Sequence, residues 1–427
     1  MKILFTILVF LYLFAYGIKI SGIPISVFIS IMSVVYIGCY GLVPKFIKTW
    51  LNEIVLILFI FYYLFFLEAL QGIEFSRENF SFYLIRILID GVIPAYVLSD
   101  IAKKIKINTA DFVYVLVAIL SIEFIISVMM VFAPDFKSII FIYVNGYSDQ
   151  HVLMNEQLFS KRGFAIAYTY LAWFPFTVAL IFSFCLFSNV IKSKIFLSLL
   201  AITVFILIAL NARIGFIPLF IGLLIYIVFS GVQGIKRIAS SALIIVFIFY
   251  LLSFFEAGDQ FDDLVKYFRK WVIEDGFSSF FSQEGSETVK DLANFQILSD
   301  FSFSDFIFGR GDILVPEKEN LYTDVGYIQT LYTGGLILSL SLYTLFILFA
   351  KRLIDVVRTL CAKGIISQIF IYFPLVICVS FLIGHVKLRI FEINEATRFL
   401  FLLVSFFVVL SEVHYDVPKF VYLKLKK

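Results

Sequence analysis

Charged residues are scarce in this 427-residue chain: Asp, Glu, Lys and Arg make up 15% of it, whereas 62% is hydrophobic. Soluble globular domains contain about 25% charged and about 45–50% apolar residues. A single core could not hide so much apolar surface from water. The composition therefore excludes a soluble globular protein and predicts that much of the surface faces lipid.

Cysteine, histidine and net charge are scarce as well. Four cysteines make no disulfide framework, and three histidines are too scattered in the sequence to indicate a metal site. A net charge of +3 gives no reason to expect nucleic-acid binding. The sequence also has no nucleotide-binding loop and no Gly-x-Ser-x-Gly motif. We therefore expect neither a cofactor nor a metal, and no ATP-driven transporter, metalloprotease or serine hydrolase.

Long apolar runs recur along the whole chain. A helix needs about 20 apolar residues to cross a bilayer, whereas a barrel needs short alternating strands, which these continuous runs do not resemble. The sequence therefore predicts an all-α polytopic membrane protein with about twelve transmembrane helices. The predicted spans are 3–18, 23–42, 54–70, 82–98, 112–132, 165–190, 195–210, 215–230, 240–255, 325–350, 365–385 and 398–413.

The connections between these spans form two alternating sets that differ in charge. One set holds eighteen basic residues against six acids, and short cytoplasmic loops are the ones enriched in Lys and Arg. We therefore predict that this set and both termini are cytoplasmic. The first apolar stretch also suits a signal peptide, but no small-residue cleavage pattern follows Ile18, which favours an uncleaved anchor. The basic residues are Lys2, Lys45, Lys48, Lys103, Lys104, Lys106, Lys192, Lys194, Lys236, Arg237, Lys351, Arg352, Arg358, Lys363, Lys419, Lys424, Lys426 and Lys427.

The opposite face carries the two longest connections, about 133–164 and 256–324. Loops longer than about 15 residues are usually functional or disordered. Apolar residues recur at helical spacing after Asp259 and again from Ser286 to Leu298, which predicts short amphipathic helices in the second connection. The expected organisation is helices 1–9 in 1–255, a periplasmic loop in 256–324, and helices 10–12 with a cytoplasmic tail in 325–427.

Two arginines are predicted to lie at the outer ends of central spans. Arg213 interrupts two apolar runs within Asn211–Gly215, and Arg162 precedes the sixth span. Arginine is the side chain best shaped for bidentate contact with phosphate, and near lipid it must be paired or reach the interface. Both positions suit ordinary contacts with lipid headgroups, and together they also suit a diphosphate site.

A third group of candidates surrounds the start of the tenth span. Arg310 lies in Gly309-Arg310-Gly311, and Asp324 and Tyr327 are three residues apart where the helix enters the membrane. Asp324 suits a helix cap near the positive end of the helix dipole. It also suits a carboxylate that orients or deprotonates a sugar hydroxyl.

Several charges are predicted inside the membrane. Arg86 and Asp90 are four residues apart in the fourth span, and Glu123 lies in the fifth. Charges within spans are candidates for function, but a pair at this spacing also serves as a structural strut. The same two interpretations are open for three charged residues in the last outer loop, Glu392, Glu395 and Arg398.

These features together resemble the bacterial O-antigen polymerases (the Wzy group) and, more distantly, the O-antigen ligases. The resemblance covers nearly the whole chain as an architecture with short patches at Arg162–Phe164, Ala212–Gly215, Ile307–Gly311, Asp324–Tyr327 and Gly334–Leu336. Ala212 departs from the group, where a hydroxyl residue is common. Ligases tend to have histidine at the position of Asp324, which favours a polymerase.

The resemblance implies an inner-membrane glycosyltransferase that joins oligosaccharide repeat units linked to undecaprenyl diphosphate at the periplasmic face. It implies catalytic roles for Arg213 and Asp324 and substrate binding by Arg162, Arg310 and Tyr327, with a chain-length regulator as a further partner. An O-antigen ligase is the alternative enzyme, and a flippase or transporter of the same lipid-linked oligosaccharide is the alternative from another class. The sequence shows no matching halves of the kind that many transporters have.

Overall fold

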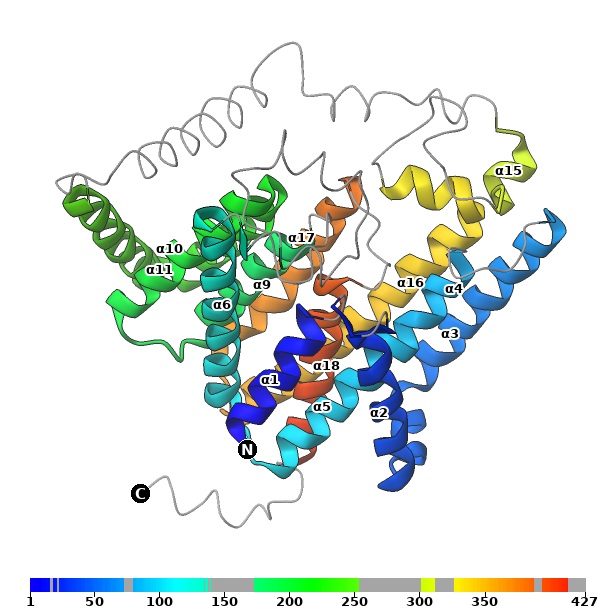
Figure 1. The fold of residues 1–427 in the computed structure, drawn as a ribbon, viewed down its shortest axis with the longest axis horizontal. Helices are drawn as coiled ribbons and strands as arrows, with labels where there is room; N and C mark the ends of the chain where they lie inside the picture. Colours follow the sequence, from blue (N-terminus) through cyan, green and yellow to red (C-terminus); the bar gives the residue numbers. More distant parts are fainter. Residues whose placement is uncertain are drawn as a thin grey trace.

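The computed structural model describes residues 1–15, 18–20, 23–72, 80–133, 135–136, 139, 173–252, 301–311, 326–387 and 394–413, and these are mostly helical (Figure 1). The α-helices are α1 (Lys2–Leu13), α2 (Ile25–Cys39), α3 (Val43–Leu70), α4 (Phe80–Arg86), α5 (Ile93–Lys104), α6 (Thr109–Phe132), α9 (Trp173–Ser188), α10 (Lys194–Asn211), α11 (Phe216–Leu252), α15 (Phe303–Phe308), α16 (Gly326–Ala362), α17 (Phe373–Lys387) and α18 (Glu395–Val413). A π-helix, η1 (Ile87–Val92), joins α4 to α5, and the 3₁₀-helices η2 (Arg213–Gly215) and η5 (Gln368–Tyr372) precede α11 and α17. The short strands β1 (Lys19–Ile20) and β2 (Ile23–Pro24) pair antiparallel between α1 and α2.

Six helical segments in the described part of the chain are long and apolar enough to cross a membrane. They are Val43–Leu70, Thr109–Phe132, Lys194–Asn211, Phe216–Ile244, Gly326–Ala362 and Gln368–His385. Shorter apolar helices, α1, α2 and α9, lie among them. The prediction of a helical protein with several helices able to span a membrane is therefore confirmed.

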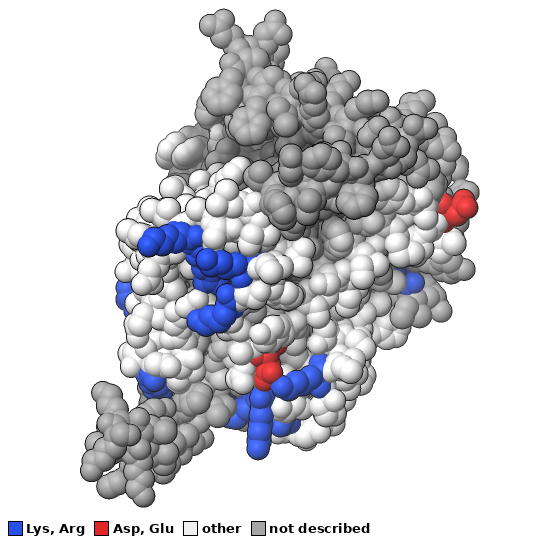
Figure 2. Space-filling model, turned by 90° about the vertical axis from the view of Figure 1, so that its left-hand side faces the viewer, with Lys and Arg blue, Asp and Glu red and all other residues white. Residues whose placement is uncertain are grey.

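The predicted spans 215–230 and 240–255 differ from the structure in how they are joined. Residues 216–230 and 240–252 of these spans lie on one helix, α11, which leaves helical geometry only at Gly231 (φ 57°, ψ −143°). Lys236 and Arg237, expected in a loop, are helical. The Arg237 guanidinium explains the difference, because it donates to Asn189 Oδ1 (2.6 Å), the Tyr226 hydroxyl (3.1 Å) and the Ile191 carbonyl (2.5 Å) and so fixes this helix against the α9–α10 connection. Figure 2 faces the side of the molecule where α10 and α11 lie in Figure 1, and Lys and Arg side chains gather there.

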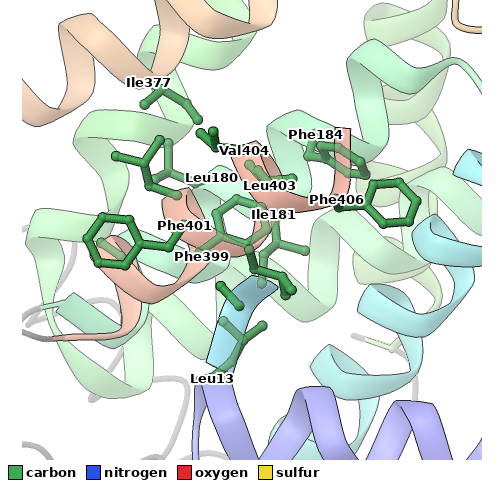
Figure 3. Packing of buried hydrophobic residues seen from close by; sticks show 14 of the residues in the cluster. Leu13, Leu180, Ile181, Phe184, Ile377, Phe399, Phe401, Leu403, Val404 and Phe406 are labelled. Atoms are coloured by element: carbon green, nitrogen blue, oxygen red, sulfur yellow. The ribbon is translucent and has the colours of Figure 1, made fainter. Parts of the chain in front are cut away.

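The core is built around α9, every residue of which is buried. A helix that is apolar on all sides is stable only when other helices surround it, and α6, α10, α11, α17 and α18 pack against α9. Phe184 of α9 meets Phe112 of α6 at 5.8 Å and Phe373 of α17 at 5.6 Å between ring centroids. Figure 3 shows Leu180, Ile181 and Phe184 of α9 among Phe399, Leu403 and Val404 of α18.

Ion pairs collect at the end of the bundle where the chain begins (Figure 1). Lys2 contacts Asp111 at 2.6 Å, and Glu412 contacts Lys45 at 2.5 Å and Lys103 at 4.0 Å. The segments predicted to be cytoplasmic contain Lys2, Lys45, Lys103 and Asp111, and Glu412 lies at the end of the last predicted span, next to the predicted cytoplasmic tail. The structure thus brings members of one predicted side together at one end of the bundle.

Candidate functional site

The helix α16 is broken near its start, at Gly334 and Gly335, where φ of Gly335 is +62°. Figure 1 shows the first segment of α16 lying at an angle to the rest, beside α15. Such a break frees backbone groups that need new partners inside a membrane protein. Broken helices in membrane proteins often mark binding sites.

The turn after α15 supplies those partners. The N–H of Arg310 donates to the Tyr332 carbonyl and that of Gly311 to the Thr333 carbonyl, both at 2.8 Å. From α3, the Tyr63 hydroxyl lies 2.7 Å from the Phe308 carbonyl and 3.1 Å from the Gly334 carbonyl. Three segments distant in sequence therefore meet at the broken helix.

Glycine is needed on both sides of this contact. A Cβ on Gly309, whose φ is +75°, would lie 2.5 Å from the Gly335 nitrogen and 2.6 Å from the Gly334 Cα. A Cβ on Gly335 would in turn lie 2.6 Å from the Gly309 nitrogen. The backbones touch so closely that no side chain fits between them.

Arg310 is oriented by its neighbours on this turn. Its guanidinium lies 3.4 Å from the Asp305 carboxylate and 5.0 Å and 5.5 Å from the ring centroids of Phe301 and Tyr332. The Ser302 backbone N–H, and to a smaller extent Arg310, lower the pKa of the Asp305 carboxyl. The Arg310 side chain remains 34% exposed, so its charge is fixed in place and accessible to an anion.

The other candidates near α16 are described only in part. Tyr327 is half-buried on the first segment of α16. It precedes Tyr332 by five residues, which turns it about 140° away from the helix face that meets Arg310. The structure therefore does not group Tyr327 with Arg310, and Asp324 lies outside the described residues.

The turn that contains Arg213 rests on the start of α9. Arg213 begins η2, as expected from its place between two apolar runs, and a Cβ on Gly215 would lie 2.7 Å from the Pro175 carbonyl. The side chain of Arg213 and the whole of Arg162 lie outside what the structure describes. Among the described elements, η2 packs with α9, α10 and α11, whereas the Arg310 turn packs on α16 and α3.

Substitution of Gly215 tests how closely the Arg213 turn depends on α9. We expect Gly215→Ala to move η2 away from Pro175, because the new Cβ meets backbone atoms that cannot rotate aside. The cost should be roughly 1–3 kcal/mol, as for overpacking of a core. Gly38→Ala is the matched control, since no atom lies within 4 Å of a Cβ at that position. Thermal unfolding in detergent compares the two, and equal midpoints would contradict the expected contact.

A second polar cluster lies inside the helical bundle. The Tyr12 hydroxyl of α1 lies 2.9 Å from the Gly91 carbonyl of η1 and 3.3 Å from the Arg398 carbonyl of α18. The buried Arg398 guanidinium donates to the Tyr12 carbonyl at 3.1 Å. Asp90, next to Gly91, contacts Arg86 at 2.8 Å. Asp90 lies within the predicted fourth span and Arg398 in the predicted last outer loop, and Tyr12 joins the elements that carry them.

In the sequence, Tyr12 and Gly91 carried no signal that separated them from other residues of apolar spans.

No protein-family model matches this chain, and no curated protein or solved structure matches it either.

Proposed function

We propose that the chain is an O-antigen polymerase, an inner-membrane glycosyltransferase that joins undecaprenyl-diphosphate-linked repeat units at the periplasmic face. The observation that carries the proposal is Arg310, which is partly exposed on a turn docked into a broken helix. In this proposal the chain crosses the membrane twelve times, with both termini in the cytoplasm and residues 256–324 in the periplasm.

The reaction needs a stabilised leaving group and an oriented acceptor. An acceptor hydroxyl on the incoming unit attacks the anomeric carbon of the growing glycan, and the bond from that carbon to the diphosphate oxygen breaks. Arg213, with Arg162 and Arg310, stabilises the departing diphosphate, as fixed positive groups do for developing anions. Asp324 orients the hydroxyl or takes its proton, with Tyr327 nearby. The proposal uses no metal and no cofactor.

Loss of Arg310 should shorten the surface polysaccharide. Removal of one fixed donor to a developing anion slows catalysis by about 100–1,000-fold, so we expect Arg310→Ala to give mostly single repeat units in a polymerase-deficient strain. Arg310→Lys keeps the charge and should retain partial activity. Gel analysis of the lipopolysaccharide reads out the chain length. Arg358→Ala, at the other end of α16, is the matched control because Arg358 is exposed.

Full-length ladders from Arg310→Ala at normal protein level would contradict the role of Arg310. Arg213→Ala and Asp324→Asn test the leaving-group and acceptor roles in the same assay. Labelling of single cysteines placed within 257–322 tests the topology. Labelling from the cytoplasm would overturn the periplasmic placement and, with it, the proposed site of reaction.

A transporter of lipid-linked oligosaccharide is the second candidate, favoured by the buried charges around Asp90 and Arg398 and by the break in α16. An O-antigen ligase remains the alternative enzyme. Deletion separates the three. A polymerase defect leaves one repeat unit on the lipid core, a ligase defect accumulates lipid-linked polymer, and a flippase defect traps single units on the cytoplasmic side.

A further inference from the structure

Arg86 and Asp90 form an ion pair within the span predicted at 82–98. The Arg86 Nε donates to Asp90 Oδ2 at 2.8 Å, and the Ser30 hydroxyl of α2 donates to Asp90 Oδ1 at 2.7 Å. Both carboxylate oxygens are thus engaged from different elements. Asp90 lies in the π-helix η1, a geometry that is frequent at functional sites.

The pair leaves one edge of the guanidinium available. Asp90 is the only hydrogen-bond partner of Arg86 within the part of the chain that the structure describes, and it occupies Nε. The Arg86 side chain is 29% exposed, whereas Asp90 is 8% exposed. The two Nη groups are therefore left without a hydrogen-bond partner in the described part of the chain, and such paired donors suit a phosphate.

The elements next to Arg86 expose apolar side chains. Ile89, one turn along the helix, is 40% exposed, and α2 exposes Phe28, Ile31 and Met32. Helix α3 packs on α4, whereas α2 packs on η1 and α5, so Arg86 stands where these two packing surfaces meet. At about 1.5 Å per residue, Arg86 lies roughly 9 Å from the start of the α4–α5 helix, the end opposite Lys103 and Lys104.

We propose that Arg86 binds the phosphate of a membrane lipid that enters from the bilayer, with its hydrocarbon chain along the exposed face of α2. An arginine at this depth is costly unless a partner satisfies its donors. Asp90 accepts from Nε and fixes the orientation, and a lipid phosphate would accept from the two Nη groups. The phosphate has two sources, a phospholipid headgroup and a polyprenyl-linked (di)phosphate. The second source rests on the proposed function, and the first does not.

Lipid binding to the full-length chain tests this site without turnover. The protein is purified, stripped of lipid and titrated by native mass spectrometry with phosphatidylglycerol, with undecaprenyl phosphate and with uncharged diacylglycerol. Because Arg86→Gln alone would leave Asp90 buried and unpaired, the main variant is Arg86→Gln with Asp90→Asn, a neutral hydrogen-bonding pair. Arg86→Lys, which keeps the charge and loses the paired donors, is the second variant, and Arg358→Gln is the control.

We expect the double variant to bind at least one phosphate lipid about tenfold more weakly, with diacylglycerol binding unchanged, and Arg86→Lys to fall between. A loss restricted to phosphatidylglycerol or to undecaprenyl phosphate supports the site and identifies its source. Unchanged binding of both phosphate lipids to the double variant overturns the proposal. If the double variant does not fold, Arg86→Lys is tested instead, and unchanged binding of both phosphate lipids to it overturns the proposal. Because no glycan transfer is measured, either result leaves the polymerase proposal to its own test.

Discussion

Gly335→Ala is expected to abolish polymerised product while the protein still accumulates in the membrane. Gly335 has φ +62°, a conformation that costs roughly 1–3 kcal/mol for other residues. The new Cβ would also meet the backbone carbonyl of Ile307 and the nitrogen of Gly309. The turn would have to leave the broken helix, and Arg310 would lose its fixed position. We expect a loss of at least about 100-fold in chain extension, comparable with loss of the arginine itself.

A matched control separates strain from contact. Gly364 also has a positive φ, +68°, but no atom lies within 4 Å of a Cβ there. Gly364→Ala therefore carries the backbone strain alone and should keep long polysaccharide chains at a modest cost in stability. Lipopolysaccharide gels and immunoblots of membrane fractions measure both variants. Equal ladders from Gly335→Ala and Gly364→Ala would show that the docked turn is not needed for activity.

The sequence predicts the individual parts of this junction but not their contact. Gly309-Arg310-Gly311 and Gly334-Gly335 stand out because glycines interrupt segments rich in apolar residues. Their pairing depends on backbone hydrogen bonds from Arg310 to Tyr332 and on the Tyr63 hydroxyl of a distant helix. Such contacts have no periodicity in one sequence. Composition predicts the helical membrane fold well, because a lipid environment allows few other structures.

In α11 the charge pattern of the sequence predicts a loop where the structure has a helix. Lys236 and Arg237 end an apolar run, and that pattern is typical of a loop. In the structure a single glycine, Gly231, turns the chain, and the Arg237 side chain is used for tertiary hydrogen bonds to the neighbouring connection. Charge marks the end of a membrane segment, but it does not show whether the helix itself ends there.

Glu53→Ala is expected to destabilise the fold more than the loss of any exposed ion pair. Arg352 Nε and Nη2 donate to the two Glu53 carboxylate oxygens at 2.8 Å and 2.9 Å. The guanidinium also lies 4.8 Å from the Trp50 ring centroid, beside the kink that Trp50 makes in α3 (φ −116°, ψ 16°). Glu53 is 2% exposed and Arg352 is 24% exposed, so removal of Glu53 leaves a largely buried guanidinium without its carboxylate partner.

Breaking a buried pair by removing one partner costs about 3–5 kcal/mol, whereas replacing both partners by apolar residues is often neutral or stabilising. We therefore expect Glu53→Ala to lower the unfolding midpoint in detergent sharply and Glu53→Leu with Arg352→Met to restore it. Lys2→Ala is the control, because Lys2 is 63% exposed in its pair with Asp111 and such pairs contribute less than about 1 kcal/mol. Tryptophan fluorescence, with Trp50 at the contact, follows the transition. If Glu53→Ala unfolds at the same midpoint as Lys2→Ala, the ion pair does not hold α3 to α16. The Trp50 kink is then maintained by apolar packing such as the contact with Phe349.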